Sequence, residues 1–177
     1  MSVAVKTFAD CLPVILREEG GFSDDARDPG GVTNLGVTAA TWAAWTGQPA
    51  TEAIMRALTP ERVTPLYRAD YWNAVDGDKL PDGLNLCVFD FAVNGGPGRA
   101  AKTLQGVVGA AQDGQVGPGT LGAIDTFVGA HGLKELVQAY CDSRAAFYRS
   151  LPTFATFGKG WLNRVDYVEG IALSWVG

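Results

Sequence analysis

The sequence predicts a mainly α-helical domain of several short helices, with room for one small β-hairpin near residues 22–38. Three observations lead to this fold class. Apolar residues recur at helical spacing in most segments, Gly- and Pro-rich turns separate those segments, and no strong alternating strand pattern occurs. Since 47% of the 177 residues are hydrophobic, the chain has enough apolar side chains to bury a sizeable core.

The first helical segment lies before residue 20, where Gly20-Gly21 ends the pattern. Pro13 lies inside it, and two arrangements are open. Asp10 caps a short helix with Pro13 in its first turn, or a longer helix kinks at Pro13. Residues 23–36 then favour an irregular loop or a tight hairpin, because they are rich in Gly and Asp. The apolar residues at helical spacing are Phe8, Cys11, Leu12, Ile15 and Leu16.

Later helices begin at recognisable local signals. Thr38 opens a short helix, and Thr59-Pro60-Glu61 combines a cap, a proline at the first helical position and an acid in the first turn. Turn residues cluster at 76–83, so we expect a first region at residues 1–83 and a helical region at 84–177 packed onto it. Further helices are expected over residues 84–91, 97–108, 133–148 and about 161–176.

Composition excludes several classes of protein. A formal net charge of -5 argues against nucleic-acid binding, because phosphates require a basic face. His131 is the only histidine, so a site with two or three His ligands cannot form. Cys11, Cys87 and Cys141 include no CxxC pair and are expected to be small buried hydrophobes. We therefore expect no metal and no cofactor, and acid–base chemistry falls to carboxylates.

Residues 1–10 lack the apolar stretch of a secretory signal peptide, and nowhere do about 18 apolar residues run uninterrupted. The expectation is therefore synthesis in the cytoplasm without a signal peptide and no stable insertion into a membrane.

The most informative carboxylate is Glu19, which ends the first helix next to Gly20-Gly21. The negative end of a helix dipole disfavours an ionised carboxylate. Against apolar groups, such a Glu stays protonated and can donate a proton, as glycosidic cleavage requires. Asp28 lies in a polar turn nine residues later and is the candidate for a companion that stays ionised.

The same residues also fit a purely structural interpretation. Residues 18–21 then form a helix end with exposed charges and a glycine C-cap, and residues 28–31 form a type II turn. Spacing alone favours this second interpretation.

Several ordered motifs nevertheless resemble glycoside hydrolase family 108, the lysozyme-like N-acetylmuramidases of phage endolysins and bacterial secretion-associated proteins. The motifs of this likeness are Glu19-Gly20-Gly21-Phe22, Asp28-Pro29-Gly30-Gly31, Thr33-Asn34, Gly36-Val37-Thr38 and Tyr71-Trp72. Residues 89–105, 113–120 and 157–164 are similar to the predicted peptidoglycan-binding module that accompanies that family. The resemblance covers nearly the whole chain.

By position, the resemblance implies that Glu19 is the catalytic acid and that Glu18 is not. More distant phage lysozymes place Glu, Asp and Thr around the cleft at fixed spacing. Glu19 and Asp28 keep the first spacing, but Asn34 stands in the third place with Thr33 beside it. Which of Thr33 and Asn34 orients a water is therefore open. Some related lysozyme-fold enzymes use the Glu alone, which makes Asp28 the weaker candidate.

Asn34 is also a candidate for substrate binding, and four further residues are candidates for that role, each with a structural alternative. Tyr71 and Trp72 can stack on the apolar faces of sugar rings, or can belong to the core. Asn94 and Gly95 can line a cleft with an amide and open backbone, or can form only a loop before a Pro-initiated helix.

The resemblance thus implies a monomeric, metal-free endolysin that cuts the β-1,4 bond between N-acetylmuramic acid and N-acetylglucosamine in peptidoglycan glycan strands. It would act in the periplasm or cell wall and reach its substrate through a holin-type opening. Two alternatives remain: a lytic transglycosylase that leaves 1,6-anhydro products, and a non-catalytic wall-binding or assembly protein.

Overall fold

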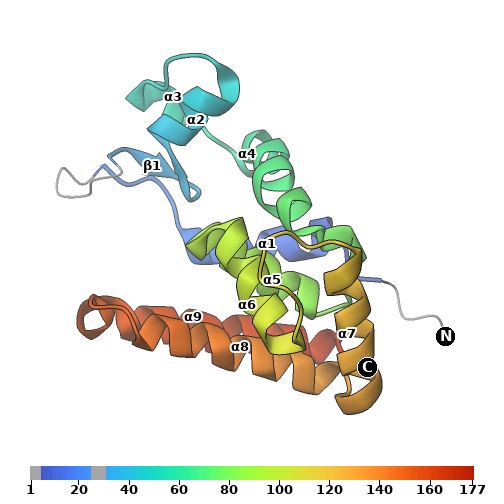
Figure 1. Cartoon of the computed structure of the whole chain (residues 1–177). Coiled ribbons are helices and arrows are strands. Elements are labelled where there is room, and N and C mark those ends of the chain that lie inside the picture. Colours follow the sequence, from blue (N-terminus) through green and yellow to red (C-terminus); the bar gives the residue numbers. More distant parts are fainter. Residues whose placement is uncertain (1–4, 25–30) are drawn as a thin grey trace.

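The computed structural model describes residues 5–24 and 31–177, which form nine α-helices, three short π- or 3₁₀-helical turns and one two-stranded hairpin (Figure 1). The predicted mainly α, lysozyme-like class with a small hairpin is confirmed. The elements are α1 (Phe8–Glu19), β1 (Thr33–Asn34), β2 (Val37–Thr38), α2 (Ala39–Thr46), α3 (Glu52–Arg56), α4 (Pro60–Tyr67), η1 (Arg68–Trp72), η2 (Asn73–Val75), η3 (Gly77–Lys79), α5 (Leu84–Gly95), α6 (Pro97–Val108), α7 (Pro118–His131), α8 (Leu133–Arg149) and α9 (Phe154–Trp175).

Helix α5 is the centre of the core. Every residue from Leu84 to Ala92 is buried, including two polar ones, Asn85 and Asp90. A helix that is apolar on all sides must be covered on all sides, and α5 packs against α1, α6, α8 and α9. Because α5 contacts helices from both halves of the chain, it joins the N-terminal part and the C-terminal helices into one core.

Helix α1 begins three residues earlier than a helix capped by Asp10 would, and so has the length of the longer arrangement. Thr7 is its N-cap, and the Asp10 carboxylate accepts a 2.8 Å hydrogen bond from the Thr7 backbone N–H. Pro13 lies inside the helix on an exposed face. Asp10 therefore completes a capping box rather than capping the helix itself, and α1 runs unbroken to Glu19.

The hairpin turns sharply between its strands. Thr33 pairs with Thr38, and Asn34 pairs with Val37. The two turn residues, Leu35 and Gly36, both have positive φ, at 50° and 73°, as a tight two-residue hairpin turn requires.

The last helix is longer than expected from the sequence. It begins at Phe154, whereas the pattern predicted a start near Trp161. Gly158 and Gly160 weaken the helical signal of this segment. Aromatic pairs one turn apart compensate, since the Phe154 ring covers Gly158 and the Phe157 and Trp161 rings lie 5.7 Å apart.

In Figure 1, the hairpin, α2 and α3 form a lobe that stands above the long antiparallel pair α8 and α9. None of the helices among residues 5–24 and 31–177 is long and apolar enough to cross a membrane.

Candidate active site

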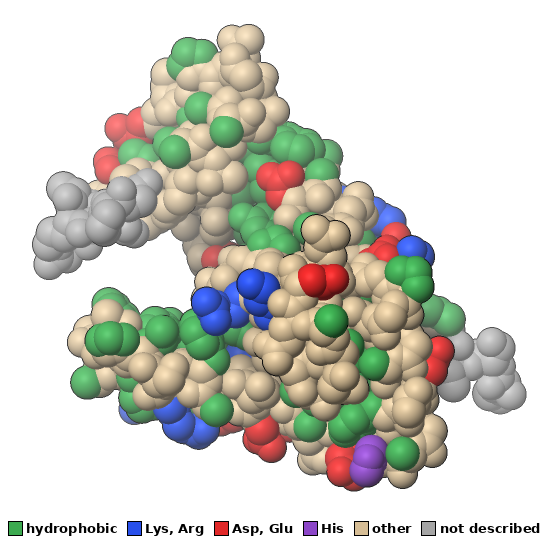
Figure 2. Space-filling view, viewed as in Figure 1, with side chains coloured by type: hydrophobic (Ala, Val, Ile, Leu, Met, Phe, Trp, Pro, Cys, Tyr) green, Lys and Arg blue, Asp and Glu red, His purple; other side chains and the backbone are tan. Residues whose placement is uncertain are grey.

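One face of the molecule is hollowed between two parts of the structure (Figure 2). The lobe of the hairpin, α2 and α3 lies on one side, and the end where α8 meets α9 lies on the other. Glu19, the last residue of α1, lies where these parts meet. It contacts Arg164 of α9, and a Cβ at Gly36 of the hairpin turn would touch it. Its side chain is 17% exposed, so the carboxylate is largely shielded but still reachable.

Among the ion pairs of the described residues, the partner of the Glu19 carboxylate is Arg164. Its Nη2 lies 2.6 Å from Glu19 Oε1. The contact is an ion pair without the alignment of a hydrogen bond, since Oε1 has no aligned donor. The same guanidinium donates aligned bonds to Asp90, from Nη2 to Oδ1 at 2.7 Å and from Nε to Oδ1 at 3.0 Å. Asp90 therefore fixes the position from which Arg164 meets Glu19.

Asp90 is shared between two arginines. It is fully buried, and its Oδ2 also accepts a 2.6 Å bond from Nη1 of Arg144, which is 1% exposed. Burial acts to lower the pKa of Arg164, but the negative charges of Asp90 and Glu19 outweigh it and raise that pKa above its usual range. Both arginines thus stay charged, and Asp90 is the anion that makes their burial tolerable.

The network continues to the C-terminal aromatic residues. Arg144 Nε donates a 3.1 Å bond to Tyr148 Oη. Tyr148 in turn donates to Oδ1 of Asn94, near the end of α5. A continuous set of polar contacts therefore links Glu19 to Asn94 through Arg164, Asp90, Arg144 and Tyr148.

Gly36 is the hairpin residue closest to Glu19, and the space around it requires glycine. A Cβ at this position would lie 2.5 Å from Tyr67 Oη, 2.7 Å from Glu19 Cγ and 2.7 Å from Glu19 Oε2. Tyr67 Oη also donates a 2.7 Å bond to the Leu35 carbonyl. The hairpin turn, Tyr67 and Glu19 are thus held in direct contact, and the missing side chain at residue 36 makes this possible.

Tyr71 lies at the same site. Its ring is half-buried with its centroid 5.5 Å from that of Tyr67. Burial raises the pKa of Tyr71, and the negative charges of Asp70 and Glu19 raise it further, which places Tyr71 within electrostatic reach of Glu19. The residue sits on the π-helical turn η1, a distortion that often occurs at functional sites.

Two residues expected to bind substrate are placed elsewhere. Trp72 is fully buried between Phe8 and Phe89, and a Cβ at Gly77 would strike its ring at 2.4 Å. The prediction that Trp72 contacts a sugar is therefore wrong, and the residue belongs to the core. Its neighbour Tyr71 is only half-buried, because successive side chains on a helical turn point in different directions.

Asn34 is the second correction. Its side chain is buried and donates a 2.9 Å bond to the Met55 carbonyl, so it fastens the hairpin to α3 instead of facing a ligand. Thr33 beside it is half-buried, and its backbone is paired with Ser23 on one side and Thr38 on the other. Of this pair, Thr33 stays the candidate for orienting a water.

Of the other residues predicted for the site, Asn94 and Gly95 are described in the structure and Asp28 is not. Asn94 is exposed and accepts the bond from Tyr148, and Gly95 is exposed with a Cβ position 2.4 Å from the Phe91 ring. Both lie at the end of α5. Asp28 lies outside the described residues.

Sequence reasoning missed Arg164, Asp90, Arg144 and Gly36 as members of the site. For Asp90 and Arg144 the sequence did contain a signal, because each is a single charged residue on an otherwise apolar helix face. Asp90 interrupts the apolar run of α5, and Arg144 lies among the buried residues of α8. Charged residues are almost never buried without a partner, so each predicted a buried ion pair, although not which residue completes it.

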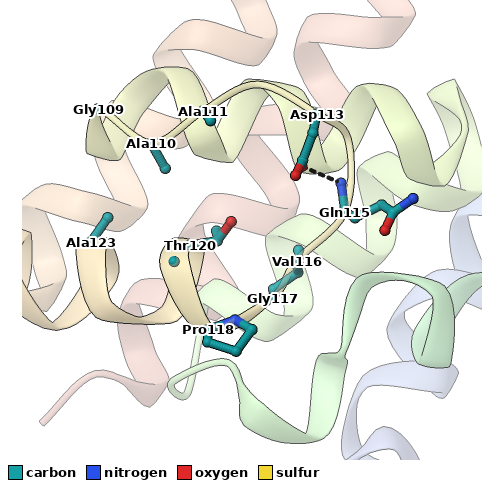
Figure 3. A pocket seen from close by; sticks show the side chains of 11 residues that line it. Gly109, Ala110, Ala111, Asp113, Gln115, Val116, Gly117, Pro118, Thr120 and Ala123 are labelled. Atoms are coloured by element: carbon teal, nitrogen blue, oxygen red, sulfur yellow. Dashed lines mark hydrogen bonds between the residues drawn. The ribbon is translucent and has the colours of Figure 1, made fainter.

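A second concavity, a groove of about 490 Å³, lies between the α6–α7 loop and the start of α7 (Figure 3). Asp113 accepts bonds there from the Gln115 backbone N–H at 2.9 Å and from the Gln105 amide at 2.7 Å. These bonds shape the loop and lower the pKa of Asp113. All lining residues come from positions 109–123, and Figure 1 places α7 at the opposite end of the molecule from the hairpin. This groove is separate from the Glu19 site.

The described residues contain no group of three or more His, Cys, Asp or Glu side chains placed to hold a metal ion. At the Glu19 site the described residues place a carboxylate, the guanidinium of Arg164 and the side chains of Tyr67 and Tyr71.

Together, a mainly α fold and a shielded carboxylate at a helix end beside a hollow define a protein of the lysozyme class. The chain belongs to the glycosyl hydrolase 108 family. The model of that family matches residues 12–96, and that of a predicted peptidoglycan domain matches residues 99–166. With both matches, the chain is a glycoside hydrolase that acts on peptidoglycan.

A solved structure supports the same assignment. The chain is similar to SagA of Brucella abortus at 44% sequence identity and a TM-score of 0.85, over 96% of this chain and 95% of that one. A search of curated proteins finds no match. The two family matches meet near residue 97, so α5 falls within the first of them, whereas the sequence pattern favoured a division at residues 83–84.

Proposed function

We propose that this protein is an N-acetylmuramidase, in which Glu19 protonates the glycosidic oxygen of the β-1,4 bond between N-acetylmuramic acid and N-acetylglucosamine. The observation that supports this role is the placement of Glu19. It is a shielded carboxylate at the end of α1, at the meeting point of the hairpin, α4 and α9. A positioned carboxylic acid is the group that glycoside hydrolysis requires at the leaving oxygen.

The residues around Glu19 hold its position. Arg164 is fixed by Asp90, and Gly36 and Tyr67 pack against the Glu19 side chain from the opposite direction. A carboxylate confined in this way loses little freedom when it meets the glycosidic oxygen, which lowers the barrier of the proton transfer. Arg164 acts here as a positioning residue.

The second half of the reaction needs a water molecule and stabilisation of the positive charge that develops on the sugar. Asp28 and Thr33 are proposed for these tasks on the strength of the sequence pattern. Thr33 supports the proposal by its place in β1, two residues before the turn that contacts Glu19.

The C-terminal helices are proposed to grip the glycan strand. Since α8 and α9 share the core with α5 and α9 carries Arg164, this half forms part of the same site. The substrate places the action of the enzyme in the periplasm or cell wall, and in a phage setting a holin-type opening would provide access.

The test is product analysis of purified peptidoglycan after digestion. A muramidase leaves reducing N-acetylmuramic acid ends, which mass spectrometry detects as a gain of one water per cut. Mainly 1,6-anhydro ends would show a lytic transglycosylase instead. Binding to the wall material without release of any muropeptide would show a non-catalytic wall-binding protein, and either result would contradict the proposal.

A further inference from the structure

The first half of α9 carries a row of residues that leads to the Glu19 site. Phe157, Gly160, Trp161 and Arg164 follow the spacing i, i+3, i+4 and i+7, which places them on one face of the helix. Arg164 contacts Glu19, so this face is continuous with the catalytic carboxylate. The distance along the helix from Phe157 to Arg164 is about 10 Å, since each residue rises about 1.5 Å.

The two aromatic rings of the row differ in how they are held. Trp161 is half-buried and stacks on Tyr148 at 5.1 Å with an angle of 26° between the rings. Tyr148 is in turn fixed by its bonds with Arg144 and Asn94. Phe157 lies 5.7 Å from Trp161 and is 54% exposed. The Trp161 ring is therefore held rigidly, and the Phe157 ring beside it is open to solvent. Together the two rings form a surface that can accept a flat apolar face without rearrangement.

Gly160 has no structural reason to be glycine. It lies inside a helix, where glycine is unfavourable, and a Cβ there would meet nothing within 4 Å. Gly158, two residues earlier, is different, because the Phe154 ring lies directly over it. A side chain at residue 160 would project beside the row formed by Phe157, Trp161 and Arg164. Glycine at this position therefore keeps the face open.

In Figure 2, hydrophobic side chains gather on the α8–α9 end, which forms one border of the hollow. An exposed aromatic surface that opens toward an acidic catalytic group is suited to pyranose rings, which present apolar C–H faces with polar groups around their edges.

We propose that Phe157 and Trp161, with Gly160 as the open floor beside them, form a sugar-binding platform for the N-acetylated pyranose units of the glycan strand beside the bond that Glu19 cleaves. The proposal rests on the proposed function for the identity of the sugar. It adds that the strand runs along α9, toward the α8–α9 end, and that Phe157 binds a ring farther from the cleaved bond than Trp161 does.

The test uses peptide-free glycan strands of alternating N-acetylglucosamine and N-acetylmuramic acid, titrated calorimetrically into the full-length protein carrying Glu19→Gln so that the strands stay intact. Phe157→Ala and Trp161→Ala are each expected to weaken binding roughly ten- to hundredfold, the value of one buried aromatic face. Trp175→Ala, at the far end of the same helix, serves as the control and should leave the affinity unchanged.

A second pair of variants excludes misfolding as the cause. Gly160→Gln adds a side chain to the floor of the platform and should raise the Tm, because it replaces an exposed helical glycine, while it weakens strand binding at least tenfold. Gly170→Gln replaces another exposed glycine of α9 whose Cβ position is open, and should raise the Tm without loss of binding.

Unchanged strand affinity in Phe157→Ala and Gly160→Gln would overturn the platform. So would a dimer that Phe157→Ala dissociates while strand affinity persists, since a second copy would then cover the face. If the variants lose binding but the wild-type protein cuts no peptidoglycan, the platform stands and the hydrolase assignment fails. If the wild-type protein cuts peptidoglycan and the variants bind normally, the platform alone is wrong.

Discussion

Arg164 Nη2 lies 2.6 Å from Oε1 of Glu19, and Asp90 accepts three hydrogen bonds from the Nε and Nη2 of the same guanidinium. The middle of the last helix is thereby fixed to the final residue of the first. This contact brings α9 to the candidate active site and connects Glu19 to the buried charge cluster of Asp90 and Arg144.

Replacement of Arg164 by lysine should lower turnover. A lysine ammonium cannot make the planar two-point contact with Asp90 and also meet Glu19. Glu19 would then be less precisely positioned, and we expect a loss of about 100-fold in kcat with a smaller change in KM. Turbidity assays over a range of peptidoglycan concentrations separate the two constants. Arg17→Lys on the exposed side of α1, where Arg17 bonds Tyr167, is the control; an equal loss there would contradict a specific role for Arg164.

Asp90→Asn should destabilise the fold. The substitution removes the anion shared by two buried arginines, and breaking a buried ion pair on one side costs about 3–5 kcal/mol. Urea denaturation followed by circular dichroism measures the free energy of unfolding. Asp78→Asn breaks the exposed pair with Arg68 and should cost less than about 1 kcal/mol. Similar costs for the two variants would show that the buried cluster is not a stabilising unit.

Gly36→Ala should impair both stability and activity. The new Cβ would lie within 2.7 Å of Tyr67 Oη and of Glu19 atoms, in addition to the strain of a left-handed backbone. Gly47→Ala provides the comparison, because Gly47 has a similar φ of 68° but open space around its Cβ position. That variant should lose only about 1–2 kcal/mol and keep its activity. Unchanged stability and full activity on peptidoglycan in Gly36→Ala would contradict the close approach of the hairpin turn to Glu19.

The three cysteines should not react in the native protein. All are buried and free, and Cys87 lies 3.6 Å from Cys141, sulfur to sulfur. The hydrogen bond from Cys141 and burial raise the pKa of Cys87, and burial raises that of Cys11, so both remain thiols at neutral pH. Titration with a chromogenic disulfide reagent should detect no thiol without denaturant and three in urea. Rapid reaction under native conditions would contradict the burial.

Local signals predicted much of the fold. Thr38 and Thr59 each precede a helix as expected, and α6 begins at Pro97. These features depend on a few adjacent residues, so a sequence pattern captures them. The beginning of α9 was missed because two glycines weaken its pattern and aromatic contacts restore it.

The site was predictable only in part, because it is built from distant segments. Glu19 was predicted from its position at a helix end beside two glycines only together with the resemblance to glycoside hydrolase family 108, since the spacing alone favoured a structural interpretation. Whether Trp72 or Tyr71 faces the site depends on the π-helical turn η1 and on the packing of Phe8 and Phe89, which no local pattern encodes. The same holds for Arg164, whose role arises from the approach of α9 to α1.

The central claim, that Glu19 is the catalytic acid, is tested most directly by comparing Glu19→Gln with Glu18→Gln in a zymogram and a turbidity assay on purified cell walls. The two variants make the same change in charge and shape at adjacent positions of α1. Glu19→Gln should lower the rate of lysis by at least about 100-fold, because general acid catalysis contributes that much or more. Glu18→Gln should lyse at the wild-type rate. Undiminished lysis by Glu19→Gln would contradict the account.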